Sequence, residues 1–151
     1  MSGTLEAIYI AEAAGAPVRL VETAYLRPGA GIDGDRYGRG AETSRDHELT
    51  LIETEVLEKV ASENGLDLAP GASRRNLHTR GIALNPLVGK RFRVGNVLCE
   101  GTRLCEPCAY LEGLLERPGL VKTLAGRGGL RALVLEEGEI RVGDTITEVA
   151  A

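Results

Sequence analysis

Two cysteines close together are the residues of this sequence best suited to chemistry. Cys105 and Cys108 are separated by two residues, one of them a proline, in the segment RLCEPCAYLE. A structural zinc site commonly needs two such pairs, or one pair with two nearby histidines. The two histidines, His47 and His78, lie on separate segments, so the usual ligand spacing for zinc is missing. A thioredoxin-type redox pair is also disfavoured, because no alternating pattern of strands and helices surrounds the cysteines.

Cys108 is the better candidate for a reactive thiolate. A short helix is expected over residues 110–116, and a helix N-terminus lowers the pKa of a nearby thiol. A thiolate attacks sulfur or binds a soft metal, and Cys105 would then resolve a persulfide or close a disulfide. The sequence leaves open the alternative that the cysteines are buried and inert. Cys99, which lies on an alternating strand, fits burial as a small hydrophobic residue best.

Two polar segments are candidates for binding an anion. A strand over SRRNLHTRG would place Arg75, Leu77 and Thr79 on one face and Arg74, Asn76, His78 and Arg80 on the other. These residues form either a solvated surface or a socket in which guanidinium forks and an amide hold phosphate or carboxylate. The segment GRGGLR adds Arg127, Gly128, Gly129 and Arg131. In GIDGDRYG, Asp33 and Asp35 are predicted to cap turns.

Short segments with alternating hydrophobicity predict a mainly β fold. About eight or nine short strands are expected, among them residues 5–13, 49–51, 76–79, 92–94 and 97–99. A longer helix is expected from the repeat of Ile52, Val56, Leu57, Val60 and Ala61, with Thr54 as N-cap and Gly65 as C-cap. Because closing the strands into a barrel removes exposed edges, we expect one closed or partly closed β-barrel with one longer helix and one or two short ones. The polar segments are expected to meet at one end of this barrel.

The overall composition narrows the classes of function. A length of 151 residues favours a single domain over residues 1–151, and 20 glycines favour many turns. The net charge of −4 gives no general reason to bind nucleic acid or an anionic membrane. The sequence has neither an apolar run long enough to span a membrane nor the features of a signal peptide. The expected location is the cytoplasm, where three cysteines would stay reduced.

The order of the motifs resembles the MOSC domain family, which is named after the C-terminal domain of molybdenum-cofactor sulfurases. The motifs are GIDGDRYG, HELTLIETEVLE, PGASRRNLHTRGIALNPLVGKRFRVG, RLCEPCAYLE and GRGGLRALVLEEGEIRVGDTI. The resemblance runs from about Gly31 to Ile146 and is to the compact, stand-alone bacterial members. It implies a β-barrel fold and one functional cysteine in a Pro-Cys pair, here Pro107 and Cys108.

The resemblance implies two related functions and leaves open whether the protein is an enzyme. In the first, Cys108 carries sulfur as a persulfide, or ligates the metal of a molybdenum–molybdopterin cofactor as a thiolate. A cysteine desulfurase or a sulfur-acceptor protein is the expected partner, because the sequence shows no pyridoxal-phosphate sulfurase domain. In the second, the protein is an oxidoreductase that reduces N-hydroxylated compounds with electrons from a separate electron-transfer partner.

The resemblance also assigns residues to a cofactor pocket. The segment with Arg75, Asn76 and Thr79 matches the one that lines this pocket in the family. The complete predicted cofactor-binding set is Arg36, Arg74, Arg75, Asn76, His78, Thr79, Arg127, Gly128, Gly129 and Arg131. Cys108 and Cys105 are assigned to catalysis, and Cys108 is also the metal ligand. The sequence departs from the family pattern at two places. Tyr37 stands where many relatives have a histidine, and Arg74-Arg75-Asn76 stands where many relatives have Gly-Glu-Asn.

Overall fold

The computed structural model describes residues 2–12, 16–35, 48–65, 71–105 and 126–149. The elements are β1 (Ser2–Ile10), β2 (Arg19–Val21), β3 (Thr23–Arg27), β4 (Gly31–Ile32), β5 (Leu49–Glu53), α1 (Thr54–Asn64), β6 (Leu77–Arg80), the 3-10 helix η2 (Asn85–Leu87), β7 (Arg91–Val94), β8 (Val97–Leu104), β9 (Leu130–Val134), β10 (Gly138–Arg141) and β11 (Thr145–Glu148). The short helix expected over residues 110–116 lies outside the described residues.

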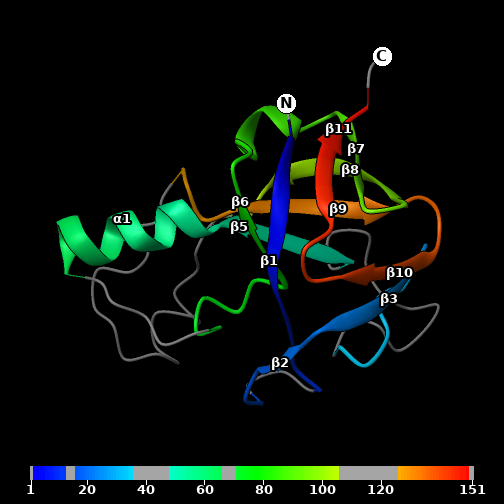
Figure 1. The fold of residues 1–151 in the computed structure, drawn as a ribbon, viewed down its shortest axis with the longest axis horizontal. Coiled ribbons are helices and arrows are strands. Elements are labelled where there is room, and N and C mark those ends of the chain that lie inside the picture. The colour runs from blue at the N-terminus through cyan, green and yellow to red at the C-terminus, as the bar shows by residue number, and fades with distance from the viewer. Residues whose placement is uncertain (1, 13–15, 36–47, 66–70, 106–125, 150–151) are drawn as a thin grey trace.

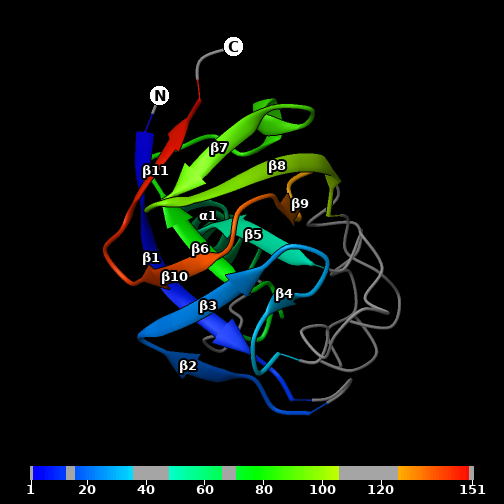
Figure 2. The ribbon, with the colours of Figure 1, turned by 90° about the vertical axis from the view of Figure 1, so that its right-hand side faces the viewer.

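Seven strands close into a barrel. Strands β11, β7, β8, β9, β5, β6 and β1 are hydrogen-bonded neighbours in that order, and β1 pairs back to β11 (Figure 1). Strand β2 pairs antiparallel with β1 and extends this sheet beyond it. Strands β10, β3 and β4 form a second, three-stranded sheet that lies across one side of the barrel (Figure 2). The predicted closed, mainly β barrel is confirmed.

The barrel interior is filled with aliphatic side chains, as the scarcity of aromatic residues requires. On β7, Phe92 and Val94 are buried while the arginines between them are exposed, which is the alternation expected of a strand with one face in the core. Cys99 of β8 is fully buried in the same core. Burial raises the pKa of its thiol to about 12, with a smaller contribution from Glu48. Cys99 is therefore an inert packing residue, as the sequence indicated.

The helix α1 connects β5 to β6, which run parallel. Ile52, which the sequence groups with the helical repeat, lies on β5 and is paired with His78, and the helix begins at Thr54. The N-cap is Glu53 rather than Thr54, and it makes no side-chain capping hydrogen bond. The predicted C-cap is confirmed: Gly65 adopts the left-handed conformation with φ 66°.

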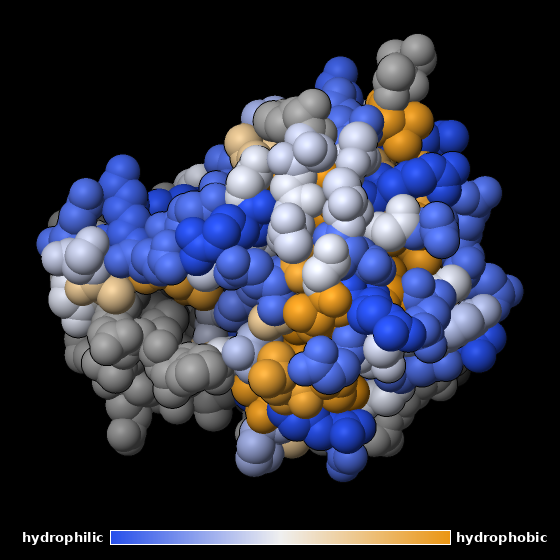
Figure 3. All heavy atoms as spheres, in the orientation of Figure 1, coloured by the Kyte–Doolittle hydropathy of each residue, from blue (hydrophilic) through white to orange (hydrophobic). Residues whose placement is uncertain are grey.

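Charged side chains attach α1 to the barrel. Arg80 of β6 binds Glu58 of α1 and Glu6 of β1, and Glu55 of α1 accepts a hydrogen bond from the Gly81 N–H. The visible surface of α1 is hydrophilic, whereas apolar side chains gather where β1 meets β2 (Figure 3). Leu20 of β2 is 58% exposed.

Within the described residues, no helix has the length and apolar character needed to cross a membrane.

Candidate functional site

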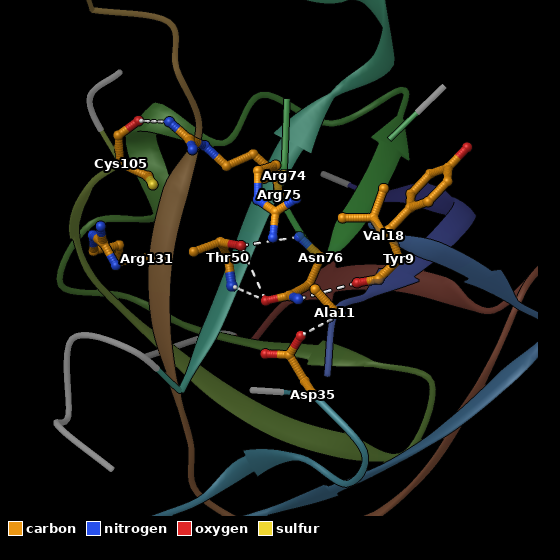
Figure 4. Close-up of a pocket in the computed structure, with 10 residues that line it drawn as sticks. All are labelled: Tyr9, Ala11, Val18, Asp35, Thr50, Arg74, Arg75, Asn76, Cys105 and Arg131. Carbon is orange, nitrogen blue, oxygen red and sulfur yellow. Dashed lines mark hydrogen bonds between the residues drawn. The ribbon is translucent and has the colours of Figure 1, made fainter. Parts of the chain in front are cut away.

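A pocket lies on the outer wall of the barrel, over four adjacent strands. Tyr9 of β1, Thr50 of β5 and Arg131 of β9 line it, together with Asn76 immediately before β6 (Figure 4). Their neighbours along each strand, such as Leu51 and Leu130, are buried in the barrel core. Because side chains alternate between the two faces of a strand, the lining residues point outward. The polar segments do converge on one pocket, as expected, and its lining residues lie on the outer face near the ends of these strands.

Connecting segments complete the pocket. Ala11 follows β1, Val18 precedes β2, Asp35 follows β4, Arg74 and Arg75 precede β6, and Cys105 follows β8. The pocket encloses about 460 Å³ of space, which includes solvent at its open side. Three guanidinium groups, of Arg74, Arg75 and Arg131, therefore line one hollow together with a carboxylate and a thiol. This donor set suits a ligand that carries an anionic group.

Arg75 ties three segments of backbone together beneath the pocket. It is only 8% exposed. Its Nε donates to the carbonyl of Gly128 at 2.8 Å, its Nη1 to that of Ser73 at 3.3 Å, and its Nη2 to that of Cys105 at 3.1 Å. The guanidinium fork therefore fixes the backbone at Cys105, three positions before Cys108. Arg75 contributes its positive charge to the pocket while most of its directed hydrogen bonds serve the fold.

Arg74 has an unusual backbone conformation. Its φ of 61° makes it the one non-glycine residue with positive φ among the described residues, and this region costs an L-residue about 1–2 kcal/mol. Its Nη1 donates to the carbonyl of Ala16 at 2.7 Å. The strained backbone directs the Arg74 side chain to the pocket wall, where it contacts the Ala16 carbonyl.

Asn76 organises the floor of the pocket. Its side-chain oxygen accepts hydrogen bonds from the Thr50 N–H at 3.2 Å and the Thr50 hydroxyl at 3.0 Å. Its Nδ2 donates to the Tyr9 carbonyl at 3.1 Å, and its own N–H donates to the Thr50 hydroxyl at 2.9 Å. Asn76 thus joins β5 and β1 at the point where β6 begins. Its side chain, which the sequence analysis assigned to cofactor binding, makes these hydrogen bonds to the neighbouring strands.

The remaining predicted site residues fall into three groups. Gly128 and Gly129 border the pocket through their backbones, since Gly128 accepts from Arg75 and the Gly129 carbonyl accepts from the Cys105 N–H at 2.7 Å. Arg127 is half-buried next to them, and His78 and Thr79, which are both described, do not line the pocket. Arg36 and Cys108 lie outside the described residues.

Thr79 and His78 are buried on opposite sides of β6. Thr79 is fully buried, and its hydroxyl donates to the Ile52 carbonyl at 3.5 Å. The imidazole of His78 packs against the ring of Tyr9, with the centroids 4.7 Å apart. Tyr9 is therefore shared between the pocket and the buried histidine, which places His78 directly behind one wall of the pocket.

His78 is expected to make the protein acid-sensitive. Its buried Nε2 has no hydrogen-bond partner within the described part of the chain, and burial lowers its pKa to about 4, although Glu6 opposes this shift. Because the folded-state pKa lies below the unfolded value of about 6.5, the unfolded chain binds the proton more readily. Stability contributed by neutral His78 is thus complete above about pH 6.5 and declines as the pH falls towards 4.

The His78→Phe variant should lack this component. Between pH 7 and pH 5 we expect the free energy of unfolding of the wild type to fall by about 2 kcal/mol more than that of the variant. Urea unfolding at both pH values measures the difference. An equal pH dependence in the two proteins would show that His78 is already protonated in the fold or accessible to water.

Gly129 is required by close packing of backbone. Its φ is 115°, and a Cβ there would lie 2.1 Å from the carbonyl oxygen of Leu51. Gly129→Ala is therefore expected to destabilise the protein by about 3 kcal/mol, combining a steric clash with a strained dihedral. Gly126→Ala is the matched control in the same turn, because Gly126 has φ 75° with nothing within 4 Å of the added atom. Its expected cost is about 1 kcal/mol; equal losses in urea unfolding would contradict the packing argument.

Sequence reasoning missed part of the lining. Tyr9 and Thr50 lie on strands whose polar members look like ordinary exposed positions, so no local signal marks them. Asp35 was interpreted as a turn residue, and it does bind backbone, since its Oδ1 accepts the Ala11 N–H at 3.0 Å. Its place in GIDGDRYG, one of the segments that carry the resemblance to the MOSC domain, was the available signal. Among the described residues, no three His, Cys, Asp or Glu side chains gather closely enough to hold a metal ion.

The comparisons identify the family. The model of the MOSC domain matches residues 36–147, well over half of the chain. The chain therefore belongs to the MOSC domain family, which is associated with molybdenum-cofactor binding and sulfurase-like function. No curated protein matches the chain.

Solved structures share the fold. The YuaD protein from Bacillus subtilis is 19% identical, with a TM-score of 0.83, and the match covers 100% of this chain and 98% of that one. YiiM from Escherichia coli is 19% identical with a TM-score of 0.75, covering 100% of this chain and 71% of that one. YiiM from Geobacillus stearothermophilus is 18% identical with a TM-score of 0.74, covering 98% and 75%. At these identities, the likeness concerns the fold.

Proposed function

We propose that this MOSC-domain protein is a molybdenum-cofactor-binding module and sulfur carrier. In this proposal Cys108 either carries sulfur as a persulfide or ligates the metal as a thiolate. The observation that supports it most directly is the pocket in which Arg74, Arg75 and Arg131 meet Cys105. Cys108 follows Cys105 by three residues, so the segment that carries it leaves the described structure at the pocket wall.

The residues present fit an anionic, pterin-based cofactor. Arg74 and Arg131 would hold its phosphate, because guanidinium groups bind phosphate with directed hydrogen bonds. Arg75 would add charge while it fixes the Cys105 backbone. When bound, the cofactor would supply two-electron redox chemistry at its metal, and Cys108 would supply a soft sulfur ligand.

The partners follow from the sulfur chemistry. A persulfide on Cys108 forms when the Cys108 thiolate takes a sulfur atom from the persulfide of a donor protein, whose thiol is released. A cysteine desulfurase is the proposed donor, and a sulfur-acceptor protein is the proposed recipient. Arg36 and Arg127 remain proposed members of the phosphate-binding set.

Metal and pterin analysis tests the proposal. Protein purified from a host that makes the molybdenum cofactor should contain molybdenum and a pterin, and Arg74→Gly should lower both at least tenfold. Stability should change by less than about 1 kcal/mol, because relief of the strained φ by glycine offsets the loss of side-chain contacts such as the hydrogen bond to the Ala16 carbonyl. Arg141→Ala is the control, since Arg141 is an exposed residue of β10. Wild-type protein without molybdenum and without pterin would overturn cofactor binding.

The second candidate function is a reductase for N-hydroxylated compounds. The open side of the pocket favours it, because a substrate must reach the cofactor. Reduction of an N–OH group to N–H consumes two electrons and two protons and releases water, so an external electron-transfer partner is required. Loaded protein with reduced methyl viologen should then consume an N-hydroxylated nucleobase. Loaded protein that leaves the nucleobase unchanged would exclude this activity for that class.

A further inference from the structure

The carboxylate of Asp35 holds an oxygen ready for a ligand. Asp35 is 5% exposed and lines the pocket. Its Oδ1 accepts the Ala11 N–H at 3.0 Å, and its own N–H donates to the Ile32 carbonyl at 3.1 Å, so backbone on both sides fixes the side chain. No donor among the described residues reaches Oδ2. Figure 4 shows this second oxygen turned away from Ala11.

A ligand can use this oxygen as an acceptor. Asp35 lines a pocket that is open on one side, so a ligand that enters the pocket can reach Oδ2. An N–H group is the natural partner, since a carboxylate is only an acceptor and its charge-assisted bonds are about twice as strong as neutral ones.

The same pocket also has positively charged groups, opposite in charge to the Asp35 carboxylate. Arg74 and Arg131 present guanidinium groups, which suit an anion, whereas Asp35 presents an acceptor. A ligand that satisfies both carries N–H donors at one end and a negative charge at the other. Like-charged repulsion from Asp35 disfavours a ligand that is anionic throughout. The pocket thus favours a ligand with N–H donors at one end and an anionic group at the other over a ligand that is anionic at both ends.

We propose that Asp35 Oδ2 is the acceptor for an amidine-like N–H edge of the ligand, while the arginine side binds its anionic group. The inference rests on the proposed function only in treating this pocket as a ligand site. Two sources offer such an edge: the 2-amino-pyrimidine ring of a pterin and the amidine group of a substrate. A carboxylate recognises both in the same way, through N–H groups attached to one carbon.

Asp35→Asn separates recognition from folding. The asparagine oxygen can still accept the Ala11 N–H, but an amide NH₂ then replaces Oδ2, and a donor faces the N–H groups of the ligand. The matched control is Asp33→Asn, two residues away, because Asp33 is 41% exposed in its side chain and pairs with Arg27 outside the pocket. Urea unfolding of both variants shows that folding is retained.

Two fluorescent probes test the pterin source. Pterin-6-carboxylate has the amino-pyrimidine edge and an anion, and lumazine-6-carboxylate carries a carbonyl acceptor in place of the amino group. Wild type and Asp33→Asn should bind the pterin at least tenfold more tightly than the lumazine. Asp35→Asn should lose at least tenfold in affinity for the pterin and little for the lumazine. Benzamidine tests the substrate source, and its binding, measured by calorimetry, should depend on Asp35 if the edge belongs to a substrate.

The outcomes separate the inference from the proposed function. An Asp35→Asn protein that binds pterin-6-carboxylate and benzamidine as tightly as the wild type overturns the inference, as does a wild type that binds neither. Protein that carries molybdenum and pterin but shows no dependence on Asp35 would retain the function and lose the inference. If protein that never acquires molybdenum or pterin binds benzamidine in a way that depends on Asp35, the inference is retained and the proposed cofactor binding is lost.

Discussion

Replacing Cys108 with serine is expected to abolish sulfur loading. In wild-type protein incubated with a cysteine desulfurase and cysteine, the Cys108 thiolate should accept a sulfur atom, and intact-protein mass spectrometry should show the added mass. A serine hydroxyl stays protonated near neutral pH and cannot attack a persulfide in this way. The loaded fraction of Cys108→Ser should therefore fall at least a hundredfold, and in a cofactor-producing host its molybdenum content should fall with it.

Cys99→Ala is the control for this experiment. Its thiol is fully buried, and its pKa is raised to about 12, so it cannot act as a sulfur carrier. The control should load as the wild type does. Cys105→Ser then shows whether the pocket-lining cysteine resolves the persulfide, because a longer-lived persulfide on Cys108 would result. Loading of Cys108→Ser at the wild-type level would refute the role of Cys108.

Replacing Arg75 with methionine is expected to produce the largest loss of stability. Methionine has a similar length but none of the donors that bind the carbonyls of Ser73, Cys105 and Gly128. Hydrogen bonds from charged groups contribute about 1.5–3 kcal/mol each and are not additive. Three buried carbonyls would lose their partner, so the free energy of unfolding should fall by about 3–5 kcal/mol in urea titrations.

Arg141→Met provides the comparison for Arg75→Met. Arg141 is an exposed arginine whose guanidinium lies 3.6 Å from Glu139, and exposed ion pairs contribute little. Its loss should cost less than about 0.5 kcal/mol. Equal stability of Arg75→Met and Arg141→Met would contradict this prediction. It would mean that water hydrogen-bonds the three carbonyls in the variant and that the Arg75 guanidinium is not needed for the fold.

The barrel was predictable because most of its strands have one buried face. Phe92 and Val94 alternate with exposed arginines, and that pattern is visible in the sequence. Strand β5 is different, since Leu51 faces the core while Ile52 is buried on the other face, next to His78. Because both faces of β5 are covered at this point, apolar and polar residues no longer alternate there. Ile52 was therefore grouped with the apolar repeat of the helix, although it belongs to β5.

The candidate site was predictable only in part. Arg74, Arg75 and Asn76 were identified because three polar residues together are conspicuous in the sequence. The use that the fold makes of them was not visible, since the partners of Arg75 come from positions 73, 105 and 128, which only the closed sheet brings together. The pairing order β9, β5, β6, β1, which creates the pocket floor, is likewise non-local and has no signature in any single segment.

The pairing of β1 with β11 has a consequence for biosynthesis. Ser2 lies opposite Thr147, so the first and last described strands are neighbours (Figure 1). A chain emerging from the ribosome cannot complete the ring of strands until β11 has been made, and contacts so distant in sequence form slowly. Until then, β1 and β7 each present an edge without its native neighbour. Chaperone contact during synthesis, and rapid release after it, would protect these two edges from pairing with other nascent chains.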